Sequence, residues 1–309
     1  MKFKSQWKKW LFMSILIVFA ISASGCRIPA DETGKTIYIW HEAIAGEGTF
    51  RTSFMDVMSN ESWFQAIIVY PLTWLINTLS VPLTVGGSVA VVTFALNTVL
   101  SLATLKSTLA QQKMQMVQPE LDRINRKYEG KTDQQSRMRM SNELNAVYKK
   151  YDINPFGTLL TTFIQFPIVI AMYQAVQRSY AVQKGEFLGM ILQNPPTVGF
   201  TKVFSGDMSG MPYVILFIIM AILQVCSMFL PMYLQKKKAR EEAEKHHRKP
   251  QEINNTMQTM QYSMIAMILI FGLTFPTAMS LYWAIYSLFN IIKTLVTQRI
   301  LDNQKMEAR

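Results

Sequence analysis

Five long stretches of this 309-residue chain contain no Asp, Glu, Lys or Arg: residues 10–26, 62–105, 153–177, 208–235 and 253–292. An apolar helix of about 18 residues or more can cross the roughly 30 Å hydrocarbon core of a bilayer. Charged residues make up 17% of the chain, compared with about 25% in soluble domains. The sequence therefore excludes a disordered chain, disfavours a soluble enzyme and predicts an all-α, polytopic membrane protein.

The first 25 residues have the features of an export signal. Four lysines precede the short apolar segment LFMSILIVFAI, and small residues follow up to Cys26. This order resembles a bacterial lipoprotein signal, although Ala23 stands where that pattern usually has Leu. We therefore expect residues 1–25 to be removed and Cys26 to carry acyl chains such as palmitate outside the cell. An uncleaved signal anchor is the alternative.

The basic residues between the apolar stretches predict the orientation of the chain. Residues 109–152 hold nine Lys and Arg, and residues 235–252 hold seven. In contrast, residues 27–85 and 182–207 together hold five, against eight Asp and Glu. The positive-inside rule assigns the first two segments to the cytoplasm. An odd number of spans must then lie between an external Cys26 and residue 109.

This parity allows only one span within residues 62–105. We expect it at 86–106, because Pro71 and Pro82 interrupt the other half. Residues 62–81 instead predict an amphipathic helix on the outer membrane surface, anchored by Trp63, Tyr70 and Trp74, within an external segment 26–85. Four further spans give five in all, with the C-terminus in the cytoplasm of a bacterial plasma-membrane protein. The remaining segments are a span at 157–179, an external loop at 180–211, a span at 212–234, a basic cytoplasmic loop at 235–255, spans at 256–273 and 277–297, and a cytoplasmic tail at 298–309.

Residues 107–152 predict a coiled-coil-like hairpin of two helices in the cytoplasm. Apolar residues recur every three or four positions in two series, and Gly130 separates the series. Two interpretations remain open: a solvated helical pair, or a docking arm for a ribosome, a targeting factor or a translocon.

Polar side chains recur along single faces of the predicted spans. Unpaired polar groups are costly in hydrocarbon, so their placement indicates a protein-lined or wet environment. Two interpretations are open. These polar side chains either bond to one another in a dry helix bundle, or they line a wet concavity that opens to the cytoplasm and has two lysines near its entrance. The candidate groove residues are Thr93, Asn97, Ser101, Thr104, Gln165, Gln224, Ser287 and Asn290, and the entrance lysines are Lys106 and Lys293.

The sequence offers no pattern for chemistry. Both GKT triplets, at residues 34–36 and 130–132, lack the glycine five residues earlier that a phosphate loop requires. His246 and His247 lie in a charged run, and the second to fifth spans contain no carboxylate. We therefore expect neither a cofactor, nor a bound metal, nor direct nucleic-acid binding, nor enzymatic activity.

Four segments together resemble the YidC family of membrane protein insertases, in its single-membrane bacterial, lipoprotein-signal branch. They are QPELDRINRKYEG in the hairpin, NPFGTLLTTFIQFPIVIAMYQAV in the second span, ILQ in the third and FPTAMSLYWAIYSLFNIIKTLVTQR in the fifth. The resemblance implies that the chain moves short hydrophobic segments of new proteins from the cytoplasm into the bilayer through a hydrated groove, without nucleotide hydrolysis. It also implies the ribosome, the signal recognition pathway and the Sec translocon as partners, alongside membrane lipids.

One position departs from the family pattern. The arginine that the resemblance leads us to expect midway along the first span corresponds to Asn97 here. We expect Tyr282 and Trp283 to form the boundary where a substrate leaves for lipid. A non-inserting assembly scaffold is the first alternative, and a channel or small-solute carrier is the second.

Overall fold

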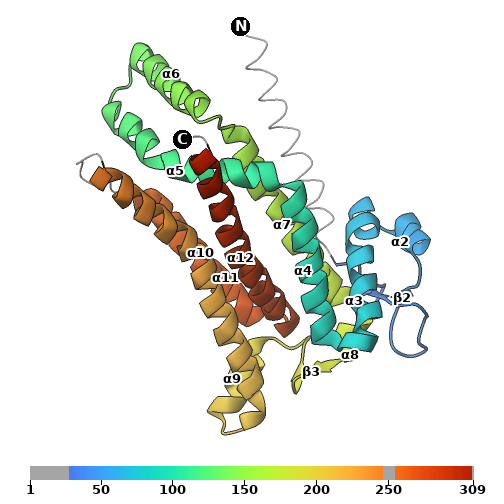
Figure 1. Cartoon of the computed structure of the whole chain (residues 1–309). Helices are drawn as coiled ribbons and strands as arrows, with labels where there is room; N and C mark the ends of the chain where they lie inside the picture. Colours follow the sequence, from blue (N-terminus) through green and yellow to red (C-terminus); the bar gives the residue numbers. More distant parts are fainter. Residues whose placement is uncertain (1–27, 246–254, 308–309) are drawn as a thin grey trace. The chain divides into compact units, whose positions relative to one another are not determined.

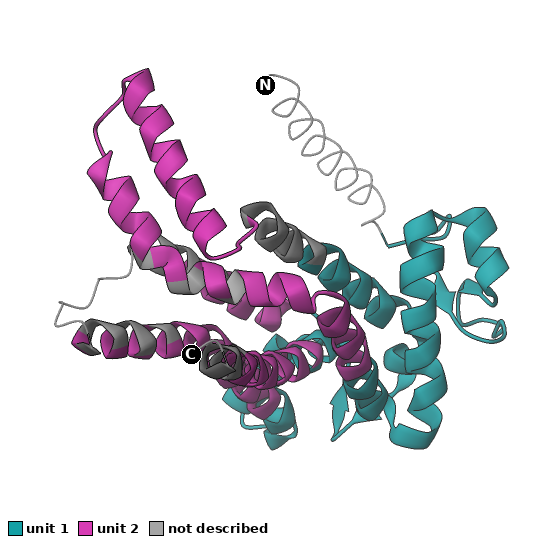
Figure 2. Ribbon diagram, turned by 45° about the horizontal axis from the view of Figure 1, so that its top comes forward, with its two compact units in different colours: residues 1–92, 165–213, 275–281 teal, residues 93–164, 214–274, 282–309 magenta. Residues whose placement is uncertain are grey.

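The computed structural model describes residues 28–245 and 255–307 (Figure 1). Cys26, His246 and His247 lie outside these ranges, so the predictions made for them are not addressed by the structure. The chain divides into two compact units, which are coloured separately in Figure 2. Unit 1 comprises residues 1–92, 165–213 and 275–281, and unit 2 comprises residues 93–164, 214–274 and 282–309.

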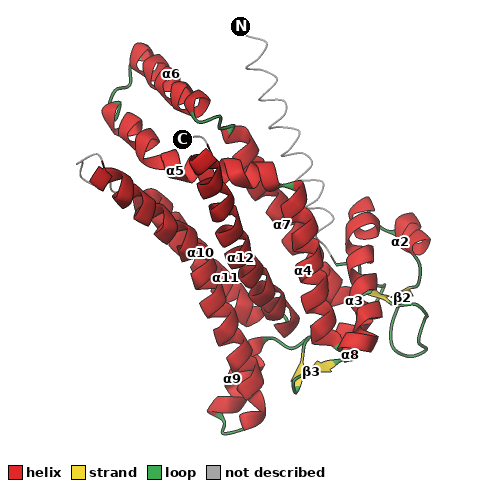
Figure 3. Cartoon of the chain, in the orientation of Figure 1, coloured by secondary structure: helices red, strands yellow, loops and turns green. Residues whose placement is uncertain are grey.

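Unit 1 contains several short helices and strands. Figure 3 shows the helices, strands and loops of the chain in separate colours. Two parallel two-residue strands pair Tyr38 with Phe50, and two antiparallel ones pair Glu186 with Ile191. These pairs and the small helices around them were not predicted, because elements of two to nine residues carry almost no periodic signal. The short elements are β1 (Tyr38–Ile39), β2 (Phe50–Arg51), α2 (Phe54–Asn60), α8 (Tyr180–Lys184), β3 (Glu186–Phe187), β4 (Met190–Ile191) and α9 (Pro196–Phe204). The longer α3 (Tyr70–Leu83) overlaps the helix predicted at residues 62–81.

A π-helical turn, η1 (Gln65–Val69), leads directly into α3. Pro71 has no N–H to donate, and its ring would clash with the carbonyl four residues earlier in a regular helix. The backbone widens just before it, so that the N–H of Tyr70 bonds to the carbonyl of Gln65, five residues back. Pro71 therefore widens this helix and does not end it.

Four helical segments within the described residues are long and apolar enough to cross a membrane: Gln65–Leu83, Val85–Ala103, Met208–Leu234 and Thr277–Ile300. The described residues are mostly helical, as expected for an all-α membrane protein. The first segment contains the helix that we expected on the membrane surface. Trp63 and Trp74 next to and within it are each about half exposed.

The long helices do not stop where the apolar sequence stops. α10 (Met211–Lys245) and α12 (Thr277–Glu307) extend well beyond the ends predicted for their spans. Lys, Arg, Glu and Gln are strong helix formers, so a charged sequence continues a helix that an apolar sequence begins. The other long helices are α4 (Val85–Ala103), α7 (Pro155–Arg178) and α11 (Asn255–Thr274).

Residues 105–150 of unit 2 form two packed helices, α5 (Leu105–Lys127) and α6 (Gln134–Lys150). Val117 and Leu121 pack with Val147 and Ile153 in a small apolar core. The chain turns at Gly130, whose φ of 77° favours glycine. A single residue, Thr104, separates the end of α4 from the start of α5.

An ion pair joins the two helices near this turn. Lys127 Nζ lies 2.6 Å from Glu143 Oε1, and the Tyr128 hydroxyl donates to the same oxygen at 2.8 Å. These two donors, Lys127 first, hold the pKa of Glu143 below its usual value. The same carboxylate raises the pKa of Lys127.

Candidate functional site

The polar face of α4 is largely buried. Thr93 and Asn97 are buried, and Ser101 and Thr104 are partly buried. The Asn97 amide donates to the carbonyl of Thr93 at 2.8 Å, and the Thr104 hydroxyl donates to the carbonyl of Leu100 at 2.6 Å. Both bonds stay within one helix, so they satisfy donors without tying α4 to a neighbour. The predicted stripe is thus more buried than other positions of the same helix such as Val99, which is 65% exposed.

Helices α10 and α12 are joined by a buried polar pair. The Ser287 hydroxyl donates to Gln224 Oε1 at 2.6 Å, and both side chains are buried. Ser227 bonds locally, to the carbonyl of Gln224 at 2.9 Å. For Gln224 and Ser287, the arrangement is the one in which polar side chains satisfy each other.

Aromatic side chains of α12 precede Ser287. Tyr282 and Trp283 are buried, and the Tyr282 and Tyr286 rings stack with centroids 5.9 Å apart. The Asn290 side chain hydrogen-bonds to Tyr286, one turn along α12. The lysines differ, since Lys106 is exposed and Lys293 is half-buried.

Gln165 is the one candidate groove residue that belongs to unit 1. Its Nε2 atom is buried and has no hydrogen-bond partner. All the other candidates, from Thr93 to Lys293, belong to unit 2. Within the described ranges, no three His, Cys, Asp or Glu side chains gather into a group that could hold a metal ion.

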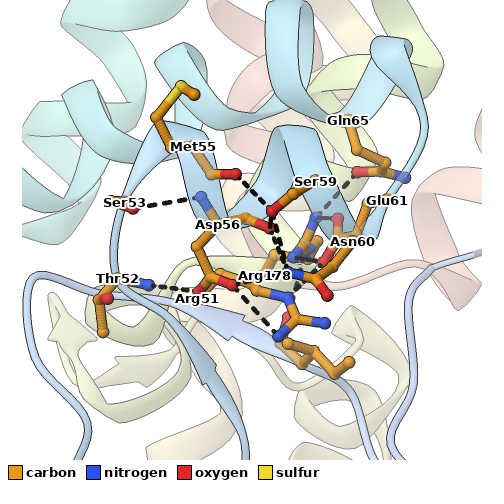
Figure 4. Close-up of polar contacts among 11 residues, drawn as sticks. Arg51, Thr52, Ser53, Met55, Asp56, Ser59, Asn60, Glu61, Gln65 and Arg178 are labelled. Carbon is orange, nitrogen blue, oxygen red and sulfur yellow. Dashed lines mark hydrogen bonds and ion pairs between the residues drawn. The ribbon is translucent and has the colours of Figure 1, made fainter.

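Sequence reasoning missed a polar cluster in unit 1, centred on Arg178 (Figure 4). This arginine is completely buried, donates to both oxygens of Glu61 at 2.7 and 2.8 Å, and donates to the carbonyl of Ile37 at 2.9 Å. It also donates to Gln65 Oε1, whose amide in turn bonds to Gln174. The available signal was an arginine directly after the uncharged stretch 153–177, too weak to identify partners more than 100 residues away.

Asn77 forms a second hub in the same unit. Its amide donates to the carbonyl of Ile39 at 2.7 Å, and its oxygen accepts from the Ser179 hydroxyl at 2.6 Å and from the N–H of Ala181 at 3.2 Å. One side chain on α3 therefore fixes both β1 and the residues that follow α7.

Comparison with known proteins gives consistent results. A family model described as "60Kd inner membrane protein" matches residues 74–305. "Membrane protein insertase YidC 2" of Listeria innocua serovar 6a is 26% identical over 310 residues, covering 99% of this chain and 88% of the relative. "Membrane protein insertase YidC" of Alkalihalophilus pseudofirmus is 28% identical over 94% of each chain. "Membrane protein insertase YidC 1" of Streptococcus pyogenes serotype M1 is 29% identical over 78% of this chain and 76% of the relative.

Proposed function

Because the chain belongs to the 60Kd inner membrane protein family, we propose that it inserts newly made proteins into the bacterial plasma membrane. The observation that carries this proposal is the extent of the family match, which includes three of the four candidate membrane helices completely. The relatives named as insertases also span most of this chain.

The proposed topology has five spans and an odd number of crossings before the basic hairpin. The mature N-terminus is external and held by acyl chains on Cys26, and the C-terminus is cytoplasmic. The charge distribution supports this arrangement, since the segments rich in Lys and Arg then all lie inside. The α5–α6 hairpin is the proposed contact for a ribosome, the signal recognition pathway or the Sec translocon.

The proposed route is a polar groove in unit 2 that opens to the cytoplasm. Buried amides and hydroxyls would line this groove: Thr93 and Asn97 on α4, Gln224 on α10 and Ser287 on α12. They can bond to the polar tail of a substrate, which would lose its hydrogen bonds if it crossed hydrocarbon directly. Gln165, on α7 in unit 1, has a buried amide nitrogen with no hydrogen-bond partner and is proposed as a separate polar contact for a substrate. The Gln224–Ser287 bond must then exchange for bonds to the substrate or to water during passage. The apolar part of the substrate leaves sideways into lipid, gaining about 25 cal/mol per Å² buried, and no chemical step is involved.

Crosslinking from α4 tests this route. A photoreactive residue at position 97 is compared with one at position 99 in membranes that contain ribosome-bound nascent membrane proteins. Asn97 is buried and Val99 is exposed on the same helix, so position 97 should crosslink to the nascent chain and position 99 to lipid. Equal crosslinking at the two positions contradicts the groove. In parallel, a bacterial strain depleted of its own insertase should regain growth; failure of a well-expressed protein contradicts insertion itself.

Asn97 favours a second candidate function, a scaffold that assembles particular membrane complexes without inserting them. This position carries an amide bonded to its own helix where the family resemblance leads us to expect a charge. A scaffold predicts crosslinks from position 97 to folded membrane proteins and none to nascent chains.

A further inference from the structure

The short helix α2 turns apolar side chains outward. Phe54, Met55 and Met58 are 39%, 70% and 44% exposed, whereas Val57 is completely buried. Positions i, i+1 and i+4 lie within one face of a helix, because successive residues are about 100° apart. A helix on a water-exposed surface normally has the opposite arrangement, with polar residues on its outer face.

The charged side chains next to α2 that Figure 4 labels are paired with one another. Arg51 lies 3.5 Å from Asp56 and 3.2 Å from Glu61, and Arg178 binds both oxygens of Glu61. Two cations thus neutralise two anions. An electrically neutral helix meets a much smaller desolvation penalty at a membrane than one with free charges.

The uncharged polar side chains of α2 bond back to their own helix. The Ser59 hydroxyl donates to the carbonyl of Met55 at 2.7 Å, and the Asn60 amide donates to the carbonyl of Asp56 at 2.8 Å. At the other end, the Ser53 hydroxyl accepts from the N–H of Asp56 at 3.2 Å. The N–H groups at a helix start have no partner within the helix, and here Ser53 supplies one for Asp56.

Helix α2 packs against a segment that is itself suited to a membrane. The Phe54 and Tyr70 rings are in edge-to-face contact with centroids 5.9 Å apart. Tyr70 lies in the apolar segment Gln65–Leu83, and the neighbouring Trp63 is 44% exposed. Exposed Trp and Tyr side chains are enriched where a protein meets the headgroup region of a bilayer.

From these observations we infer that the Phe54–Met55–Met58 face of α2 rests in the lipid bilayer, at the boundary between headgroups and acyl chains. With the proposed topology, this is the outer leaflet. Three side chains are too few for a stable protein interface, which buries about 1,200 Å² or more in total. The same three are sufficient for an interfacial contact that adds to other membrane anchors, because each contributes in proportion to the apolar area it buries.

Depth-dependent quenching in vesicles tests this inference without any measurement of insertion activity. The full chain with Cys226→Ser is prepared with Met55→Cys or, separately, Glu42→Cys, and a polarity-sensitive fluorophore is attached. Both positions are strongly exposed in unit 1, but Glu42 lies outside the apolar face. Vesicles of phosphatidylcholine and phosphatidylglycerol carry a quencher either near the headgroup or deep in the acyl chain.

We expect the shallow lipid quencher to reduce fluorescence at position 55 and to leave position 42 unchanged, whereas aqueous iodide should quench only position 42. Signal from the Cys226→Ser parent is subtracted. Met58→Cys provides a second reporter on the same face, in case the first variant does not fold. If iodide quenches positions 55 and 58 as strongly as position 42 in vesicles, the face is in water or awaits a protein partner, and the inference is overturned.

Discussion

The two units satisfy their buried polar groups in different ways. In unit 1, Arg178 and Asn77 bond to groups between 38 and 141 residues away in the sequence. In unit 2, Asn97, Thr104 and Ser227 bond to carbonyls three or four residues away in their own helices. Long-range bonds fix the positions of segments relative to each other, whereas local bonds leave the contacts between helices to packing.

This difference bears on the groove proposed for unit 2. Unit 1 has a polar framework around the C-terminal end of α7. In unit 2, Asn97 and Thr104 bond to carbonyls of the preceding turn and not to another helix. A route for varied substrates requires such uncommitted groups, because each passing segment brings its own hydrogen-bond partners.

The largest effect should follow from removing the buried arginine of unit 1. Arg178→Met leaves the Glu61 carboxylate, which is 5% exposed, without its main partner. Breaking a buried ion pair in this way costs about 3–5 kcal/mol. We expect faster proteolysis of residues 28–61 and a lower thermal unfolding temperature in nanodiscs.

Lys184→Ala is the matched control, since it removes the exposed partner of Glu47 in the same unit. Exposed ion pairs contribute about 0–1 kcal/mol, so this variant should behave nearly like the parent. Equal effects of Arg178→Met and Lys184→Ala would show that the framework around Arg178 does not hold unit 1 together.

The sequence predicted the long helices and failed on the framework for one physical reason. A helix repeats every 3.6 residues, so the uncharged stretches around α4, α10 and α12 are visible locally. The partners of Arg178 are Ile37 just before β1, Glu61 just after α2, and Gln65 in η1, which only the folded chain brings together. The polar stripe of α4 was predictable from spacing, but the bond between Gln224 and Ser287, 63 residues apart, was not.

The next largest effect concerns a positive charge introduced at position 97 of α4. A charged side chain at the centre of a membrane helix costs about 2.5–3.5 kcal/mol on insertion scales. If Asn97 faces a wet groove, Asn97→Arg should be produced at nearly the parental level and should improve insertion of substrates with acidic tails. Insertion is measured by protease protection of matched substrates with acidic and neutral tails; no dependence on tail charge shows that position 97 does not contact them.

A smaller effect is expected from the polar pair between α10 and α12. Hydrogen bonds between membrane helices contribute about 0.6 kcal/mol on average, so Gln224→Leu and Ser287→Ala should each destabilise the protein only slightly. Their double variant should lose little more, since each single change already breaks the bond at 2.6 Å. The coupling is measured by a double-mutant cycle of unfolding in mixed micelles. A coupling of several kcal/mol would mean that this pair is a fixed framework, like the one in unit 1.

The smallest effect concerns the exposed ion pair of the α5–α6 hairpin. The pKa of Glu143 is lowered by Lys127 and Tyr128, so the contact stabilises the hairpin above the pKa of an unfolded glutamate, about 4.3, and is lost as the pH falls through the lower folded value. Because both side chains are well exposed to water, the loss should be slight and reduced further by salt. Hydrogen exchange at Val147, measured between neutral and acidic pH and corrected for intrinsic rates, should show a weak loss of protection that Glu143→Gln removes. An unchanged acid response in Glu143→Gln would assign the loss to another carboxylate of the hairpin.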